Sequence, residues 1–280
     1  MLEGPIKKEK GSFIISARRS YVDVFLRAAD EENTVYFYDV NAKANWKKDN
    51  KNRFFLAMYL GRDVFSFDDT FGFDWGNATA TFRWNHLFND RLFSNTSLIA
   101  SNFDYKLEFD DPTQGFEWTS NLREFTFKED LNYLVNPNNE LEFGYHLTYR
   151  QFSPGVISPS GENSLFAINE LDKLYALDHA IYAGNQQSIS DRLMLKYGVR
   201  VSIFQNVGNQ DVFIYEDPTN NIDPIRTDTV SYGTLENIET YVNVEPRVSI
   251  RYILNSTSSI KASYNRMVQN THLISSGTVP

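Results

Sequence analysis

The chain has 280 residues, enough for one large β domain or two smaller ones, and its 41% hydrophobic and 15% aromatic content excludes a disordered chain. A net charge of −9 without a basic stripe argues against a nucleic-acid partner. The absence of cysteine excludes a disulfide scaffold and a thiolate metal site, and no apolar run approaches the ~18 residues of a membrane-spanning helix.

Alternation of polar and apolar residues predicts long β-strands in series. The alternation is clearest at 36–46, 76–84, 141–150, 193–203 and 242–252. Less regular stretches that we also assign to strands lie near 12–24, 53–66, 92–109, 120–134, 173–188 and 258–268. We expect roughly eleven strands, many of about 10–15 residues, which exceeds the ~5–6 residues of a common globular strand.

The connections between these strands alternate between short and long. Short polar turns are expected at Lys48–Asn52, Asn89–Arg91, Asn136–Asn139, Ser190–Arg192 and Asn255–Ser258. Longer connections are expected at Arg27–Asn33, Asp110–Gly115, Ser153–Asp172 and Val207–Glu239. Short turns at one end and long loops at the other are typical of an outer-membrane β-barrel.

The composition of the two strand faces also favours a membrane barrel. One face is wide, apolar and aromatic on strand after strand, which would leave a very large exposed patch on a soluble monomer. In a bilayer that face would contact lipid, and the mixed polar face would line the lumen. Aromatic residues near the expected strand ends suit the interfacial girdles, namely Tyr36, Tyr38, Trp46, Trp84, Tyr145 and Tyr149. The predicted fold is therefore all-β, an antiparallel transmembrane barrel with short periplasmic turns and long extracellular loops.

Charged residues on the expected lumen face are the candidate ligand-contacting side chains, since they could steer an anionic substrate or contact a domain inside the barrel. They could equally form a hydrated wall of weak cross-strand ion pairs. The candidates are Lys43, Arg83, Asp104, Arg150, Arg200, Glu245, Arg247 and Arg251.

Two long connections and one proline give further expectations. The connection 207–239 is acidic and could bind Ca²⁺, but it lacks the spacing of a calcium loop, so a solvated loop is the better interpretation. Its charged residues are Asp211, Glu216, Asp217, Asp223, Asp228, Glu236 and Glu239 against Arg226. Leu165, Phe166 and Ile168 in the loop 153–171 are expected to fold back over the barrel mouth.

Pro246 removes a ladder donor inside a strand and predicts a β-bulge.

No motif in the sequence indicates an enzyme. Walker A, GxGxxG and GxSxG patterns are absent, as is a Ser/His/Asp arrangement. The four histidines, His86, His146, His179 and His272, show no metal-binding spacing. We expect no catalytic site, no metal site and no cofactor.

Two stretches resemble the barrel of TonB-dependent outer-membrane receptors of the kind common in Bacteroidetes-type bacteria. They are GPIKKEKGSFIISARRSYVDVFL at 4–26 and EPRVSIRYILNSTSSIKASYNRMVQNTHLIS at 245–275. GRDVFSF at 61–67 and the hairpin HAIYAGNQQSISDRLMLKYGVRVSIF at 179–204 have the same character, so the resemblance covers almost the whole chain.

The resemblance implies a function, a location and partners. Such receptors sit in the outer membrane of Gram-negative bacteria and take up scarce nutrients such as siderophores, glycans or peptides. Implied partners are outer-membrane lipid, the TonB–ExbB–ExbD complex acting through a plug domain, a small nutrient ligand and a surface lipoprotein. The family barrel has about 22 strands around a plug. Neither a plug nor a TonB box is visible, so residues 1–280 are expected to be part of one barrel that cannot transport by itself.

Two other classes of function remain open at this stage. One is a self-contained small barrel, either a passive porin or an outer-membrane hydrolase, which would need a signal peptide with a closing last strand or a catalytic cluster. The other is a soluble β-rich protein that binds glycans, which would be soluble as a monomer without detergent.

Overall fold

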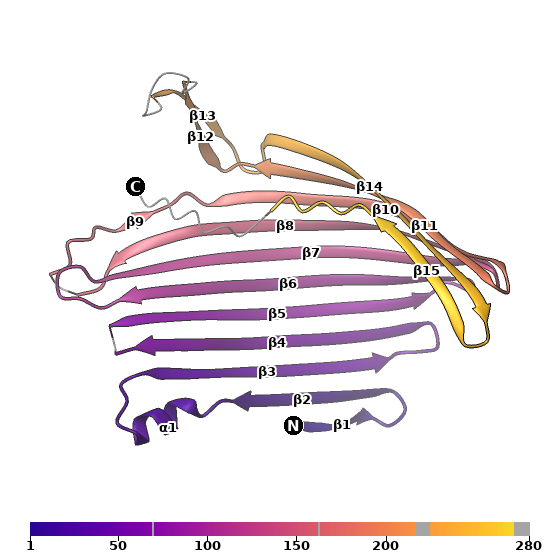
Figure 1. The fold of residues 1–280 in the computed structure, drawn as a ribbon, viewed down its shortest axis with the longest axis horizontal. Coiled ribbons are helices and arrows are strands. Elements are labelled where there is room, and N and C mark those ends of the chain that lie inside the picture. The colour runs from indigo at the N-terminus through magenta and orange to yellow at the C-terminus, as the bar shows by residue number, and fades with distance from the viewer. Residues whose placement is uncertain (69, 162, 217–224, 272–280) are drawn as a thin grey trace.

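The computed structural model describes residues 1–68, 70–161, 163–216 and 225–271, and these form an all-β chain with one short helix (Figure 1). Neighbouring strands pair antiparallel. The strands are β1 (Leu2–Lys7), β2 (Gly11–Arg19), β3 (Thr34–Lys47), β4 (Asn52–Phe67), β5 (Phe71–Leu87), β6 (Leu92–Phe109), β7 (Phe116–Asn136), β8 (Asn139–Pro159), β9 (Asn169–Glu170), β10 (Leu174–Ser190), β11 (Leu193–Val207), β12 (Gln210–Tyr215), β13 (Arg226–Tyr232), β14 (Asn237–Asn255) and β15 (Ser258–Asn265). The helix is α1 (Val22–Ala28).

Most strands belong to one continuous sheet. Its order is β1-β2-β3-β4-β5-β6-β7-β8-β10-β11-β14-β15, while β9 pairs with β8 and the β12–β13 hairpin stands apart. The sheet does not close on itself within the described residues, since β1 and β15 are its two ends. The prediction of long antiparallel strands is confirmed, and the path holds twelve strands rather than the expected eleven.

Short turns lie at one end of the sheet, which we call the short-turn end; the opposite end is the long-loop end (Figure 1). All five predicted turns are present, and each is built around a side-chain oxygen that accepts from the backbone N–H of a residue two or three positions later. These oxygens belong to Asp49, Asn89, Asn136, Ser190 and Asn255. Asn, Asp and Ser are common turn residues because their side chains replace the missing backbone acceptor.

One face of the sheet carries an apolar band. The cross-strand row Met58, Ala80, Ala100, Phe125 and Tyr149 runs through it from β4 to β8. On β8 the apolar residues of this face extend over 141–149 and on β14 over 242–252, which is the ~9–11 residues that a tilted strand needs to cross a bilayer. Its side chains are 42–62% exposed at Leu56, Met58, Leu60, Phe82, Leu98, Phe125, Ile181 and Val242.

A soluble sandwich would bury such residues against a second sheet. In the part of the chain that the structure describes, the buried apolar residues are Ala176, Ala180, Phe204 and Val207 alone. A sheet of this size with so small a core needs another medium for its apolar face, and lipid fits that requirement. None of the described helices is long and apolar enough to cross a membrane.

The two faces exchange character towards the long-loop end. On the face of the apolar band, Leu60 of β4 is followed by Arg62, which forms ion pairs with Asp74 and, at 3.1 Å, with Asp104. Beyond them, Lys106 lies 2.9 Å from Glu117. These long strands therefore continue past the apolar band, where the same face meets water.

Three local features differ from the sequence predictions. Residues 22–28 form α1 instead of continuing a strand, and Asp23 accepts hydrogen bonds from Arg19 at 2.7 Å and Arg27 at 2.8 Å. The connection 207–239 contains the β12–β13 hairpin. The predicted bulge at Pro246 is wrong: its pairing with Val199 is regular.

Pro246 fits because it lies at the end of the β14–β15 ladder, where the donor that it lacks would be the last of that ladder. Its carbonyl accepts from the backbone N–H of Arg266, so its nitrogen points to the same side of β14. There β15 ends at Asn265, opposite Arg247.

Replacement of Ala80 by Arg tests which face contacts lipid. We expect Ala80→Arg to lower the free energy of unfolding in lipid vesicles by about 2–4 kcal/mol, the cost of a cation facing the bilayer midplane. The neighbouring Thr79→Arg places the same charge on the opposite face, and we expect a much smaller loss. Equal losses, measured by urea unfolding, would contradict the assignment.

Asp111, in the loop between β6 and β7, gives a pH prediction. Backbone N–H groups of Thr113 and Gln114 and the Thr113 hydroxyl hold the pKa of Asp111 below its usual value. Its folded pKa is depressed, so its contribution to stability is present above the unfolded pKa of ~4 and is lost as pH falls through the folded pKa. We expect Asp111→Asn to be less stable than the parent at pH 7 and to converge with it in acid. A difference that persists unchanged at low pH would refute this.

Candidate functional site

The face opposite the apolar band, here called the polar face, carries most of the predicted lumen residues. Its reference row is Tyr59, Thr79, Ser101, Glu124 and Arg150, each one residue from a member of the apolar row. Because successive side chains alternate, each strand places one set of residues on each face. The polar face is therefore the place where a solute inside a closed barrel would meet the chain.

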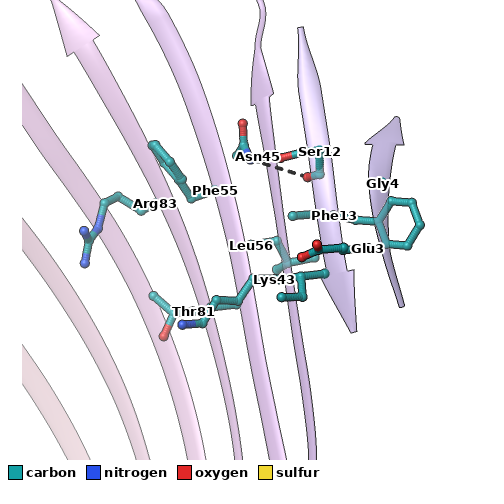
Figure 2. Close-up of a pocket in the computed structure, with 13 residues that line it drawn as sticks. Glu3, Gly4, Ser12, Phe13, Lys43, Asn45, Phe55, Leu56, Thr81 and Arg83 are labelled. Carbon is teal, nitrogen blue, oxygen red and sulfur yellow. Dashed lines mark hydrogen bonds between the residues drawn. The ribbon is translucent and has the colours of Figure 1, made fainter. Parts of the chain in front are cut away.

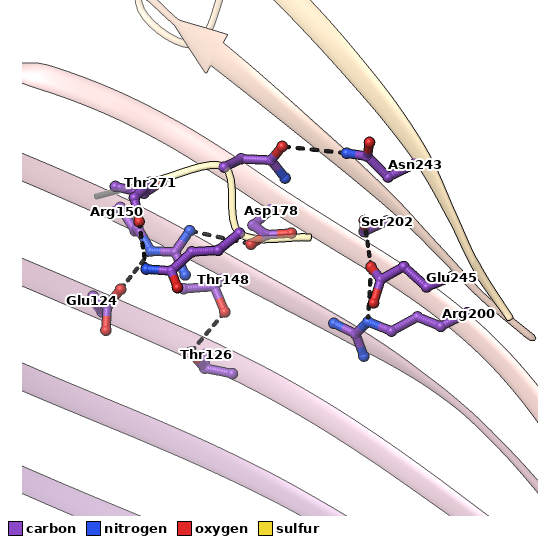
Figure 3. Close-up of polar contacts among 12 residues, drawn as sticks. Glu124, Thr126, Thr148, Arg150, Asp178, Arg200, Ser202, Asn243, Glu245 and Thr271 are labelled. Carbon is purple, nitrogen blue, oxygen red and sulfur yellow. Dashed lines mark hydrogen bonds and ion pairs between the residues drawn. The ribbon is translucent and has the colours of Figure 1, made fainter. Parts of the chain in front are cut away.

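Arg150 on β8 joins three neighbouring strands. Its Nε donates to Glu124 of β7 at 2.5 Å and its Nη1 donates to Asp178 of β10 at 3.2 Å (Figure 3). Thr126 and Thr148 pair beside it at 2.9 Å. Arg150 is thus held by two carboxylates, which fixes its position and leaves little of its charge for a ligand.

Arg200 belongs to a second network that crosses β8, β11 and β14. Its Nη1 lies 3.2 Å from Nδ1 of His146, and its Nε lies 4.0 Å from Glu245. Glu245 is 4% exposed, and it accepts from Ser202 at 2.9 Å (Figure 3) and from Arg247 at 3.5 Å. Two hydrogen-bond donors, Ser202 and Arg247, and the nearby charge of Arg200 compensate the burial of Glu245.

The second network continues across β7 and β10. Asp130 accepts from the Tyr182 hydroxyl, forms an ion pair with Lys128 at 3.0 Å and lies 3.4 Å from Nε2 of His146. A separate pair, Lys196 and Glu142 at 2.9 Å, joins β11 to β8 across β10. On β10, Gly184 is the cross-strand partner of Glu142 and Gln186 is that of Lys196. Gly184 lacks a side chain that would block this diagonal pair.

Lys43 and Arg83 lie away from these networks, near the short-turn end of β3 and β5. They line a hollow of about 790 Å³ together with Glu3, Asn45 and Phe55 (Figure 2). Within the described parts of the chain, neither cation has an ion-pair partner. Their charges are therefore available to a ligand.

The remaining candidates divide between the two faces. Arg251 lies on the polar face at the short-turn end, opposite Lys261 of β15. Asp104 was predicted to face the lumen, and this is wrong: it pairs with Gly76, on the side of the apolar band. The alternation along β6 is regular, but its even positions change from apolar to charged beyond Ala100, and periodicity alone does not locate that change.

An aromatic patch on the polar face at the long-loop end was missed by the sequence reasoning. It consists of Phe37, Phe65, Phe73, Trp75 and Tyr105, carried by β3 to β6. The rings of Phe73 and Trp75 lie 5.0 Å apart and those of Phe73 and Tyr105 6.3 Å apart. A shallow hollow of about 330 Å³ borders Phe37, Phe65 and Trp75. The sequence did contain a signal for this patch. Aromatic residues occupy the odd positions 65, 73 and 75, whereas the apolar residues further along β4 and β5 occupy even positions.

The structure tests only part of what the sequence predicted for the long loops. Phe166 packs against Phe116 of β7 at 5.0 Å between ring centroids, whereas Leu165 and Ile168 are 83% and 74% exposed. The acidic residues Asp217 and Asp223, and also His272, lie outside the described residues. Among the described residues, no cluster of His, Asp and Glu has the composition of a metal site.

No protein-family model and no curated protein sequence matches this chain. Solved structures do match. The closed form of the ferric-catecholate import receptor Fiu from E. coli K12 has a TM-score of 0.65 and 12% identity, over 94% of this chain and 47% of that one. The siderophore receptor PiuA from Acinetobacter baumannii has a TM-score of 0.64 and 9% identity, over 94% and 46%. The copper transporter OprC has a TM-score of 0.65 and 9% identity, over 92% and 41%.

The chain spans less than half the length of these three proteins. At such low identity the likeness shows the fold alone: an antiparallel sheet that matches part of a TonB-dependent receptor barrel. The matched proteins are receptors and transporters by their names. The open ends of the sheet, β1 and β15, fit a partial barrel.

A double-mutant cycle tests whether the ion pairs are part of the wall. We expect Arg150→Met and Glu124→Gln to be coupled by about 1 kcal/mol in unfolding free energy, because each removes the direct contact between the two groups, while Asp178 remains beside Arg150. Arg123 and Glu117, on the other face, serve as the control because they form no ion pair with each other; Glu117 pairs with Lys106 instead. Additive effects for the Arg150 cycle would show that the contact carries no net energy.

Proposed function

We propose that this chain is part of the barrel of a Gram-negative outer-membrane receptor that takes up a scarce nutrient by a TonB-dependent mechanism. The observation that carries the proposal is the division of one continuous sheet into an apolar band of membrane height and a polar face with cross-strand ion pairs. A lipid-facing outer wall and a hydrated lumen require this division. The low-identity likeness to the three receptors and transporters supports the same fold.

The proposal extends to parts and partners that the chain itself does not contain. Residues 1–280 would be completed by further strands and by a plug domain, through which the TonB–ExbB–ExbD complex would act. The stretches at 4–26 and 245–275 favour a Bacteroidetes-type receptor. A surface lipoprotein over the long loops belongs to the same proposal. As a partial barrel, the chain alone is not expected to transport, because its open edges leave backbone groups unpaired.

The aromatic patch is the part of the wall best suited to hold a nutrient with a flat or apolar face. Phe37, Trp75 and Tyr105 lie at the long-loop end, where a ligand from outside the cell would first meet the polar face. Aromatic rings stack on apolar faces of sugars and on planar ring systems. A siderophore, a glycan and a peptide can each offer such a face, so the patch does not distinguish among these three classes of nutrient.

Uptake by the source bacterium is the test of the proposed function. Deletion of the gene that encodes this chain should abolish uptake of one compound from a panel of ferric siderophores, oligosaccharides and peptides. Because the mechanism is energised, a protonophore should abolish that uptake in the parent strain. Uptake that survives the protonophore would indicate a passive porin and would contradict the proposal. A product found only in soluble fractions would favour the glycan-binding alternative.

Substitution of Trp75 tests the role of the aromatic patch. In the complete receptor we expect Trp75→Ala to weaken binding of the transported compound by about 2–10-fold, the equivalent of one lost aromatic contact. Trp84→Ala is the matched control, because Trp84 lies on the opposite face and donates to Asn52 at 3.0 Å. Equal weakening by both variants, measured by equilibrium binding, would remove the patch from the ligand site.

A further inference from the structure

Four cations gather on the polar face near the short-turn end, and we call them the cationic corner. They are Lys43 and Lys47 of β3, Arg53 of β4 and Arg83 of β5. Lys47 and Arg53 are direct cross-strand partners. Like charges placed opposite each other on a sheet are destabilising, so the sequence maintains an unfavourable pair here.

Most other cations of the polar face show the opposite arrangement, although Arg251 lies opposite Lys261 of β15. From β7 to β14 five of its cations each lie within 4.0 Å of a carboxylate, namely Lys128, Arg150, Lys196, Arg200 and Arg247. Throughout the described ranges, no member of the cationic corner has such a partner. The corner is thus a local positive region in a chain of net charge −9.

The cationic corner borders a hollow, and neutral amide side chains lie beside it. Lys43 and Arg83 line the 790 Å³ hollow, in which Glu3 is the one carboxylate among the lining residues. Figure 2 shows the hollow, with the Asn45 amide donating to the Ser12 hydroxyl at 2.7 Å. The next row contains Asn85, opposite Arg53. Four positive charges against one negative charge leave a net attraction for anions.

We propose that the cationic corner is a binding site for a multivalent oxyanion, a group of phosphates or carboxylates spaced over several ångströms. Arginine presents a planar fork of donors that matches phosphate or carboxylate oxygens, and lysine adds a mobile point charge. Four cations spread over three strands suit several anionic groups better than one. This site does not depend on the identity of the nutrient, since it lies at the end of the polar face opposite the aromatic patch.

The charge distribution along the sheet also indicates from which end the anion arrives. The β11–β14 connection at the long-loop end is acidic, with exposed Asp211, Glu216, Asp228 and Glu236 against Arg226. Those charges repel free anions approaching from that side. An anion therefore reaches the corner most readily from the short-turn end, either as a small solute or as an acidic stretch of polypeptide.

Calorimetric titration of the full 280-residue chain, refolded in detergent micelles, tests the proposal with two probes. The first is tripolyphosphate and the second is a hexaglutamate peptide. We expect saturable binding of at least one probe, weakened at least tenfold in the K43Q/R83Q double variant and weakened by added salt, since the contact is electrostatic. Tighter binding of tripolyphosphate indicates a small solute as the source, and tighter binding of the peptide indicates an acidic polypeptide.

Two further variants separate the site from net charge and from folding. K48Q/K51Q removes two charges from the adjacent β3–β4 turn, and we expect its affinity to stay within twofold of the parent. K43R/R83K keeps both charges and should retain binding even if K43Q/R83Q folds poorly, as judged by circular dichroism. The proposal is overturned if neither probe binds, or if the turn variant loses as much affinity as K43Q/R83Q.

Discussion

The fold depends on one constraint, which is that each strand of a single sheet must satisfy two different media at once. Side chains alternate between the faces, so a shift of one residue in register would move every apolar residue of a strand to the polar side. From β3 to β8 the alternation is kept over five consecutive strand pairs. The register shifts among them lie near the end of β7 and at the Pro154–Gly155 region. Turn side chains such as Asp49 and Asn89 fix where each strand reverses.

The candidate site follows from that constraint. Charges excluded from the apolar band collect on the polar face, where strands held about 5 Å apart bring carboxylates and guanidinium groups into contact. Two such clusters are Arg150 with its two carboxylates and the buried Glu245 with Ser202, Arg247 and Arg200 around it. At the long-loop end the same constraint acts in reverse: Arg62 and its acidic partners occupy the side of the apolar band, and the aromatic patch occupies the polar face. The polar face therefore changes along the strands, from the aromatic patch at the long-loop end to the cationic corner at the short-turn end.

The sequence predicted the strands, the turns and most of the faces because all of these depend on local patterns. Lys43, Arg83, Arg150, Arg200 and Arg247 were placed on the polar face by alternation alone, and the structure confirms that placement. Asp104 was misplaced because alternation shows which residues share a face and not where a strand leaves the membrane. Helix α1 was missed although the ion pairs of Asp23 are local, with Arg19 four residues before it and Arg27 four residues after it, because the strand pattern of 12–19 was extended into the helix. The partners of each charge could not be predicted, since they depend on register between strands.

The most direct test of this account is a scan of lipid and water contact along β4. The chain contains no cysteine, so single cysteines can be introduced at positions 54–66 and labelled with nitroxide spin labels in vesicles. We predict that labels at the even positions 56, 58 and 60 contact lipid-soluble oxygen, that labels at odd positions contact a water-soluble relaxation agent, and that the pattern ends at Arg62, where both faces meet water. Uniform water contact at all positions, or alternation that continues unchanged through residue 66, would contradict the assignment of the two faces.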